Sequence, residues 1–275
     1  MQPYILSAFA HMSYSRSKSR VHKVLEAVGR TIVLTSVLAG CGGGGSAGAT
    51  APTVPAAPAT PSKPGSAVPS IQLGNWVVMG SSTAAGVGAP TGKGWVAMLQ
   101  TEWASKKYVV VNIAKGGATT YHGISSTATP VSNRPMPDNA ANIDQALARK
   151  PVLLIVSYPT NDTASGYAVD ETVNNLLSIR AKALAASVPV VIVSTQPRAL
   201  PASQLIQLRD IDQRLVNEVG ACFVAVRAKL AGPDDKLAFI YDSGDAVHPN
   251  QAGHAVIATA VSDVLRNDAC VHLLP

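Results

Sequence analysis

Residues 71–275 alternate short apolar runs with longer segments of helical period. Five runs rich in β-branched residues have the length of strands, and they cover residues 76–80, 108–113, 152–157, 188–194 and 222–226. Helices are predicted over residues 94–105, 137–149, 169–187, 201–219 and 250–266. Strands that are apolar throughout and alternate with helices are typical of a parallel sheet covered on both faces. We therefore predict one α/β domain with a parallel sheet of about five strands.

Residues 1–40 have a different pattern. Residues 1–30 contain five basic residues and one acid, and an apolar run of residues 31–40 follows. A basic segment, an apolar core of about ten residues and small residues at its end are typical of a secretory signal. The sequence LAGC, which ends at Cys41, resembles a bacterial lipobox. This resemblance implies cleavage before Cys41 and acylation of that cysteine, while an ordinary signal peptide with a chance cysteine is the alternative.

Residues 42–70 show no apolar periodicity. Of these 29 residues, 26 are Gly, Ala, Pro, Ser or Thr, a composition typical of an extended and solvated linker. We expect residues 41–70 to tether the domain to a membrane through lipid on Cys41. The protein is then exported and lipid-anchored in the cell envelope, and Gly42 after the cysteine favours the outer membrane if the cell is Gram-negative.

Most of the net positive charge of the chain lies in its first forty residues. The 275 residues carry 22 Lys+Arg against 16 Asp+Glu, and a net charge of +6 alone favours a nucleic acid or an anionic membrane as partner. Residues 1–40 contain five of the basic and one of the acidic residues, so 17 basic and 15 acidic residues remain. This near-neutral remainder argues against nucleic acid as a partner. Three cysteines are too few for a disulfide-built scaffold.

Polar residues follow several of the predicted strands, and the ligand sites of such sheets lie beyond the carboxyl ends of the strands. Ser82 follows the first strand, Gly117 the second and Asn161 the third, while Asp245 and His248 precede the last helix. At a spacing of three on a helical turn, Asp245 can hold the Nδ1–H of His248 and leave Nε2 free to deprotonate Ser82. Each residue alone is more often a turn or capping residue. Their conjunction at one sheet edge favours a serine hydrolase.

In chain order these segments resemble the four sequence blocks of the GDSL (SGNH) hydrolase superfamily, over essentially all of residues 71–275. The resemblance implies a three-layer α/β/α, flavodoxin-like fold and a serine hydrolase. It implies that Ser82 is the nucleophile, His248 the base and Asp245 the triad acid. It also implies an oxyanion hole formed by the N–H groups of Ser82 and Gly117 and the side chain of Asn161.

Two residues depart from the family pattern. The family reads Gly-Asp-Ser where this chain has Ser81 before Ser82, and a serine hydroxyl accepts the hydrogen bonds that shape such a turn more weakly than an aspartate. The family reads Gly-x-Asn-Asp where this chain has Pro159, which removes an N–H and fixes φ near −65°. We expect both departures to alter loop geometry and substrate choice, because neither residue makes or breaks bonds.

The expected function is that of a serine esterase or acylhydrolase that cleaves carboxylic esters. Short acyl groups, including carbohydrate O-acetyl groups, are the leading substrates because the chain lacks an obvious long aliphatic lid. A lysophospholipase or thioesterase-like acylhydrolase is one alternative, and a non-catalytic envelope binding protein on the same fold is another. The chemistry needs no cofactor and no metal. We expect a monomer whose partners are a small-molecule or glycan ester and the membrane.

Four further residues have competing interpretations. Cys222 and Cys270 remain after Cys41 is acylated, and in an exported domain they can form a disulfide, the alternative being two separate thiols. Asp242 is a rival triad acid that lacks the spacing of three from His248. A second histidine on the last predicted helix, His254, is interpreted as a packing residue.

Overall fold

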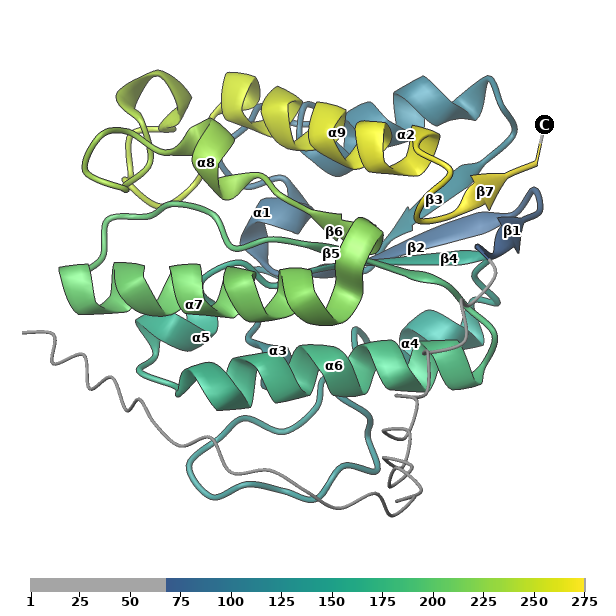
Figure 1. The fold of residues 1–275 in the computed structure, drawn as a ribbon, viewed down its shortest axis with the longest axis horizontal. Coiled ribbons are helices and arrows are strands. Elements are labelled where there is room, and N and C mark those ends of the chain that lie inside the picture. Colours follow the sequence, from purple (N-terminus) through teal and green to yellow (C-terminus); the bar gives the residue numbers. More distant parts are fainter. Residues whose placement is uncertain (1–67, 275) are drawn as a thin grey trace, which may run out of the picture. The chain divides into compact units, whose positions relative to one another are not determined.

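The computed structural model describes residues 68–274, and its central feature is a sheet of five parallel strands (Figure 1). The strands are β2 (Asn75–Gly80), β3 (Val109–Asn112), β4 (Leu153–Ser157), β5 (Val190–Val193) and β6 (Phe223–Val224). Their order across the sheet is β3-β2-β4-β5-β6, and every neighbouring pair is parallel. This is the doubly wound, flavodoxin-like order, so the predicted fold class is confirmed.

Helices cover both faces of this sheet (Figure 1). One face carries α2 (Trp95–Ala104), α8 (Arg227–Leu230) and α9 (Gln251–Arg266). The other face carries α4 (Ile143–Ala148), α6 (Val169–Ala185) and α7 (Ala202–Val219). Three single-turn helices, α1 (Ser82–Ala85), α3 (Thr120–Gly123) and α5 (Asn161–Ala164), come after β2, β3 and β4. The short helices therefore lie beyond the carboxyl ends of these strands.

The side chains of residues 76–79 show why β2 is apolar over most of its length. Trp76 and Val78 are buried in the core beneath α2 and α9, whereas Val77 and Met79 are buried in the core beneath α6 and α7. Successive side chains of a strand point to opposite faces, so a strand covered on both sides has no solvent-facing position. The same alternation accounts for the apolar runs that predicted β4 and β5.

Four of the predicted helices begin and end within two residues of α2, α6, α7 and α9, but the start predicted at residue 137 is wrong. That helix, α4, begins at Ile143, and its N-cap is Asn142, whose side chain accepts from the Gln145 N–H at 3.0 Å. The preceding residues form a turn instead, in which the carbonyl of Asp138 accepts from two N–H groups that follow it. Asn142 satisfies a free N–H of the first helical turn, and this capping bond fixes where the helix starts.

A second, two-stranded sheet and a disulfide fasten the ends of the described chain. β1 (Ser70–Ile71) pairs in parallel with β7 (His272–Leu273). Cys222, at the end of the 3₁₀ helix η1 (Gly220–Cys222), forms a disulfide with Cys270, which is buried just before β7. The bond therefore joins the segment that enters β6 to the segment that leaves α9.

The predicted N-terminal features fall mostly outside this description. The signal predicted for residues 1–40, the acylation predicted at Cys41 and the linker as far as residue 67 lie outside the described residues. Within residues 68–274, no helix combines the length and the apolar character that crossing a bilayer requires.

Candidate active site

Ser82 lies in the turn after β2, as the first residue of α1. Its neighbours are held by the adjacent strands: the Ser81 N–H donates to the carbonyl of Ser157 at 3.0 Å, and Asn112 Nδ2 donates to the carbonyl of Ala84 at 2.7 Å. β2 is flanked by β3 and β4, at the point where the strand order reverses and doubly wound sheets bind their ligands. The fold thus presents the Ser82 hydroxyl at the edge where a site is expected.

Ser81 stands at the start of α1, at the position where the family pattern has an aspartate. It is buried and is the N-cap of α1, yet its side chain makes no capping hydrogen bond. The Ser81 hydroxyl therefore adds no capping bond to the turn that carries Ser82. The backbone bond from Ser81 to β4 and the side chain of Asn112 hold the turn in its place.

Asp245 and His248 lie in the loop that precedes α9, and they do not share a helical turn as the spacing suggested. The loop is closed by an antiparallel bridge between Asp242 and Pro249. Oδ1 of Asp245 accepts from the N–H groups of Val247 (2.9 Å) and His248 (2.8 Å), and Oδ2 lies 2.6 Å from His248 Nδ1. One carboxylate in an Asx-type turn thus holds both the backbone and the ring of the histidine.

The ring of His248 connects this loop to Ser82, because its Nε2 lies 2.8 Å from Ser82 Oγ. With the Nδ1–H donated to Asp245, Nε2 is the nitrogen that can accept a proton. Partial desolvation raises the pKa of Asp245, but hydrogen bonds from the His248 ring and from two backbone N–H groups hold it well below its ordinary value. The side chain of His248 is 18% exposed and that of Asp245 is 47% exposed, so the imidazole is the more sheltered of the two.

Gly88, in the loop between α1 and α2, packs against the back of the histidine loop. Its φ is +98°, in the region that favours glycine. A Cβ at this position would lie 2.2 Å from the carbonyl oxygen of Pro249 and 2.9 Å from the Cβ of His248. The absence of a side chain at Gly88 is therefore a condition for the observed position of His248.

His254 fastens the same α1–α2 loop to α9. Its Nδ1 accepts from the Trp95 N–H at 3.2 Å, so the neutral ring carries its proton on Nε2, which donates to the carbonyl of Val87 at 2.9 Å. The ring is fully buried, and burial lowers its pKa. His254 is thus a packing residue that shapes the loop behind the site and makes no contact with Ser82.

Gly117 and Asn161 lie at the same sheet edge as Ser82, after β3 and β4. Gly117 has a φ of +76°. Asn161, the first residue of α5, donates from Nδ2 to the carbonyl of Ala118 at 2.9 Å and keeps a second N–H hydrogen for a ligand. Among the backbone hydrogen bonds of residues 68–274, neither the Ser82 N–H nor the Gly117 N–H is a donor. The N–H groups of Ser82 and Gly117 and the second Nδ2 hydrogen of Asn161 are therefore left without an acceptor among residues 68–274.

Asp162 connects the Asn161 turn to the Gly117 loop, a role that sequence reasoning missed. Its side chain is buried, and its two oxygens accept from the N–H (2.9 Å) and the hydroxyl (2.5 Å) of Thr120. Burial raises the pKa of Asp162, and the two bonds from Thr120 oppose that rise. Asp162 thus connects the turn after β4 to the loop after β3. Its sequence signal was its match to the last residue of the Gly-x-Asn-Asp block.

Arg198 is a second residue that sequence reasoning missed. It follows β5, and its Nη1 lies 3.4 Å from Thr160 Oγ1 and 3.4 Å from Asn161 Oδ1. Burial lowers the pKa of Arg198, and the charge of Asp245 opposes that effect. No motif or spacing signals a single arginine in a loop, so only the structure could find it.

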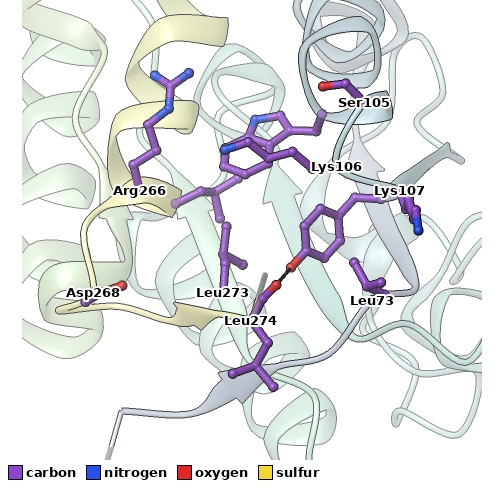
Figure 2. A pocket seen from close by; sticks show the side chains of 11 residues that line it. Leu73, Ser105, Lys106, Lys107, Arg266, Asp268, Leu273 and Leu274 are labelled. Carbon is purple, nitrogen blue, oxygen red and sulfur yellow. Dashed lines mark hydrogen bonds between the residues drawn. The ribbon is translucent and has the colours of Figure 1, made fainter.

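Other candidate features lie apart from Ser82. Asp242 accepts from the N–H groups of Gly244 and Ala246 and so supports the loop backbone. A cavity of about 610 Å³ is lined in part by Leu73 and Lys107 (Figure 2). These two residues precede β2 and β3, so the cavity lies at the sheet edge opposite to Ser82. Within residues 68–274, no group of three or more His, Cys, Asp or Glu side chains could hold a metal ion.

The sequence matches the family model of the GDSL-like lipase/acylhydrolase family over residues 78–256, which is more than half of the chain. The matched region includes all five residues of the predicted triad and oxyanion hole. No curated protein matches this sequence.

Several solved structures share the fold. A structure of TesA covers 70% of this chain with 98% of its own length, at 23% identity and a TM-score of 0.55. A GDSL-like lipase from Bacteroides thetaiotaomicron covers 70% with 87% of its length, at 18% identity and a TM-score of 0.53. A member of the lipolytic protein G-D-S-L family from Veillonella parvula covers 70% with 99% of its length, at 18% identity and a TM-score of 0.52.

Proposed function

The chain belongs to the GDSL-like lipase/acylhydrolase family and is an ester-bond hydrolase, and on this premise we propose that Ser82, His248 and Asp245 are its catalytic triad. One observation carries the proposal: hydrogen bonds of 2.6 and 2.8 Å run without a break from Asp245 through the His248 ring to Ser82 Oγ. This is the geometry at which a histidine held by a carboxylate takes a proton from a serine hydroxyl.

In the first half of the proposed reaction, Ser82 Oγ attacks the ester carbonyl carbon while its proton moves to His248 Nε2. The carbonyl electron pair moves onto oxygen, and this oxyanion accepts from the N–H groups of Ser82 and Gly117 and from Asn161 Nδ2. Asp245 stabilises the imidazolium that forms. The tetrahedral intermediate then collapses, the bond to the alcohol oxygen breaks, and His248 gives its proton to the leaving alcohol.

In the second half of the proposed reaction, a water molecule takes the place of the released alcohol. His248 takes a proton from water, the resulting hydroxide attacks the acyl-serine carbonyl, and the same three donors stabilise the second oxyanion. Collapse breaks the bond to Ser82 Oγ, and His248 returns the proton to the serine. The acid is released, and the enzyme is back in its starting protonation state.

We propose that the acyl group is short, with carbohydrate O-acetyl groups as the leading natural class. The support is the openness of the site: Gly117 and Asp245 are exposed, and Ser82 and Asn161 are half-buried. A shallow site accommodates a bulky alcohol such as a glycan and offers little apolar wall to a long acyl chain, which deep ligand pockets provide.

The proposed function is tested by turnover of nitrophenyl esters with acyl chains from acetyl to dodecanoyl. We expect kcat/KM to be highest for the shortest chains, Ser82→Ala to abolish turnover, and Ser105→Ala, at an exposed serine at the end of α2, to leave it unchanged. A maximum at long chains would instead favour the lysophospholipase or thioesterase-like alternative. Turnover unaffected by Ser82→Ala would refute the triad, and absence of any turnover would favour a binding protein.

We also propose that the enzyme is exported and held at the envelope by acyl chains on Cys41, on the sequence signals of residues 1–41. The expected result is that full-length protein partitions into the membrane fraction and that Cys41→Ser releases it. Equal membrane recovery of the two proteins would contradict the anchor.

A further inference from the structure

Arg198 brings a positive charge to the candidate active site. Its guanidinium approaches the turn that carries Asn161, with Nη1 at 3.4 Å from both Thr160 Oγ1 and Asn161 Oδ1. Both contacts are long for hydrogen bonds, and both partners are neutral. Since Asn161 Nδ2 is the proposed oxyanion donor, Arg198 lies on the other end of the same amide group.

The charge of Arg198 is not balanced by an ion pair. Within residues 68–274, no carboxylate lies within 4.0 Å of its guanidinium, whereas Arg134 is paired with Glu171 and Arg214 with Asp170. Its Nε is buried and has no hydrogen-bond partner among these residues. An arginine keeps its charge in proteins, and a partly buried charge without a partner lowers stability. Asp245 attracts this charge without forming an ion pair with it, so an anion supplied by a ligand would stabilise the guanidinium.

We propose that Arg198 binds a negatively charged group of the ester substrate, so that the enzyme prefers anionic over neutral esters. A guanidinium presents a planar fork of donors that matches a carboxylate or a phosphate. Because only the Asn161 amide separates Arg198 from the oxyanion position, the anion has to lie within a few bonds of the scissile ester. This inference rests on the proposed esterase function and adds the charge of its substrate.

The test compares substrates that differ only in charge. For the acyl side, the pair is 4-nitrophenyl glutarate, with a free carboxylate, and its terminal amide; for the alcohol side, it is 4-acetoxybenzoate and 4-acetoxybenzamide. We expect the wild-type protein to favour the anionic member of one pair by roughly 10- to 100-fold in kcat/KM, the range for a hydrogen bond to a charged group. The pair that shows the preference identifies the side of the ester that carries the anion.

Three variants separate charge recognition from other roles of this arginine. Arg198→Gln is expected to bring the anionic-to-neutral ratio close to one, and Arg198→Lys to retain part of the preference. Arg214→Gln, which removes an exposed charge on α7, is the control and should leave the ratio unchanged. Added salt should reduce the wild-type ratio and leave that of Arg198→Gln unaffected.

The results that would contradict the role of Arg198 can be told apart from those that would contradict the esterase. An anionic-to-neutral ratio near one in the wild type, or a ratio that Arg198→Gln does not change, overturns the inference while Ser82-dependent turnover still supports the esterase. A uniform loss of turnover on both members of each pair makes Arg198 a positioning residue for Asn161 and also overturns it. Absence of Ser82-dependent turnover on all four esters overturns the proposed function and the inference with it.

Discussion

Loss of the Cys222–Cys270 disulfide is expected to lower the free energy of unfolding by about 4 kcal/mol. The two cysteines are 48 residues apart, and the chain-entropy model gives that value for a closed loop of this size. The loop contains α8, the Asp245–His248 segment and all of α9. Reduction therefore gives the unfolded chain more conformational freedom over the whole segment that carries Asp245 and His248. The packing of α9 on α2 in the folded state remains.

The assay is denaturant unfolding of residues 68–275 with and without a reducing agent, compared with the Cys222→Ala, Cys270→Ala double variant. We expect reduction to lower the unfolding midpoint of the wild-type domain and to leave that of the double variant unchanged. Mass spectrometry after alkylation should show two thiols modified only after reduction. A loss of less than about 1 kcal/mol in the free energy of unfolding would refute the reasoning. Alkylation of both thiols without reduction would also refute it, because no cross-link would then constrain the unfolded chain.

Three further predictions concern the site and the loop behind it. Asn161→Ala should lower kcat by roughly 10²–10³ with the fold retained, as for the loss of one oxyanion donor, and near-normal turnover excludes this role. Gly88→Ala should lower kcat by on the order of 10²-fold by displacing His248. Gly92→Ala, at a φ of +74° with no atom within 4 Å of its Cβ, should lower stability alone, and equal kcat values for the two variants contradict the contact between Gly88 and the His248 loop. Burial lowers the pKa of His254 below its unfolded value of about 6.5, so its contribution to stability is complete above that pH and is lost as the pH falls through the lower folded value. NMR titration of the ring should give a pKa below about 6.5, and a higher value contradicts the neutral, buried ring.

The strands could be predicted because burial on both faces of the sheet makes consecutive residues apolar, and most helices because their apolar residues recur at helical period. Residues 76–79 of β2 and 153–156 of β4 are apolar on both faces of the sheet, which few other structures require. The start of α4 could not be predicted from Pro137, because a proline favours a helix start without specifying one, and the bond between Asn142 and the Gln145 N–H decides it. The single-turn helices after the strands are too short to show a period.

The residues that meet at the site could be named from the sequence, but the way they are held could not. Asp245 and His248 have the spacing of a helical turn, yet the structure uses an Asx-type turn that gives the same ring contact. Gly88 contacts the His248 loop, and Arg198 contacts the Asn161 turn, from segments far away in the sequence, and neither residue belongs to a spacing pattern. Contacts of this kind depend on how loops are placed by the sheet, which a local pattern does not encode.

The central claim is that Ser82 is a nucleophile activated by His248, and covalent labelling tests it most directly. A fluorophosphonate reacts with an activated serine, and peptide mass spectrometry locates the adduct. We expect one adduct, on the peptide that contains Ser82, with no labelling of Ser82→Ala and much slower labelling of His248→Ala. An unlabelled wild-type protein, or an adduct on another serine, would contradict the account.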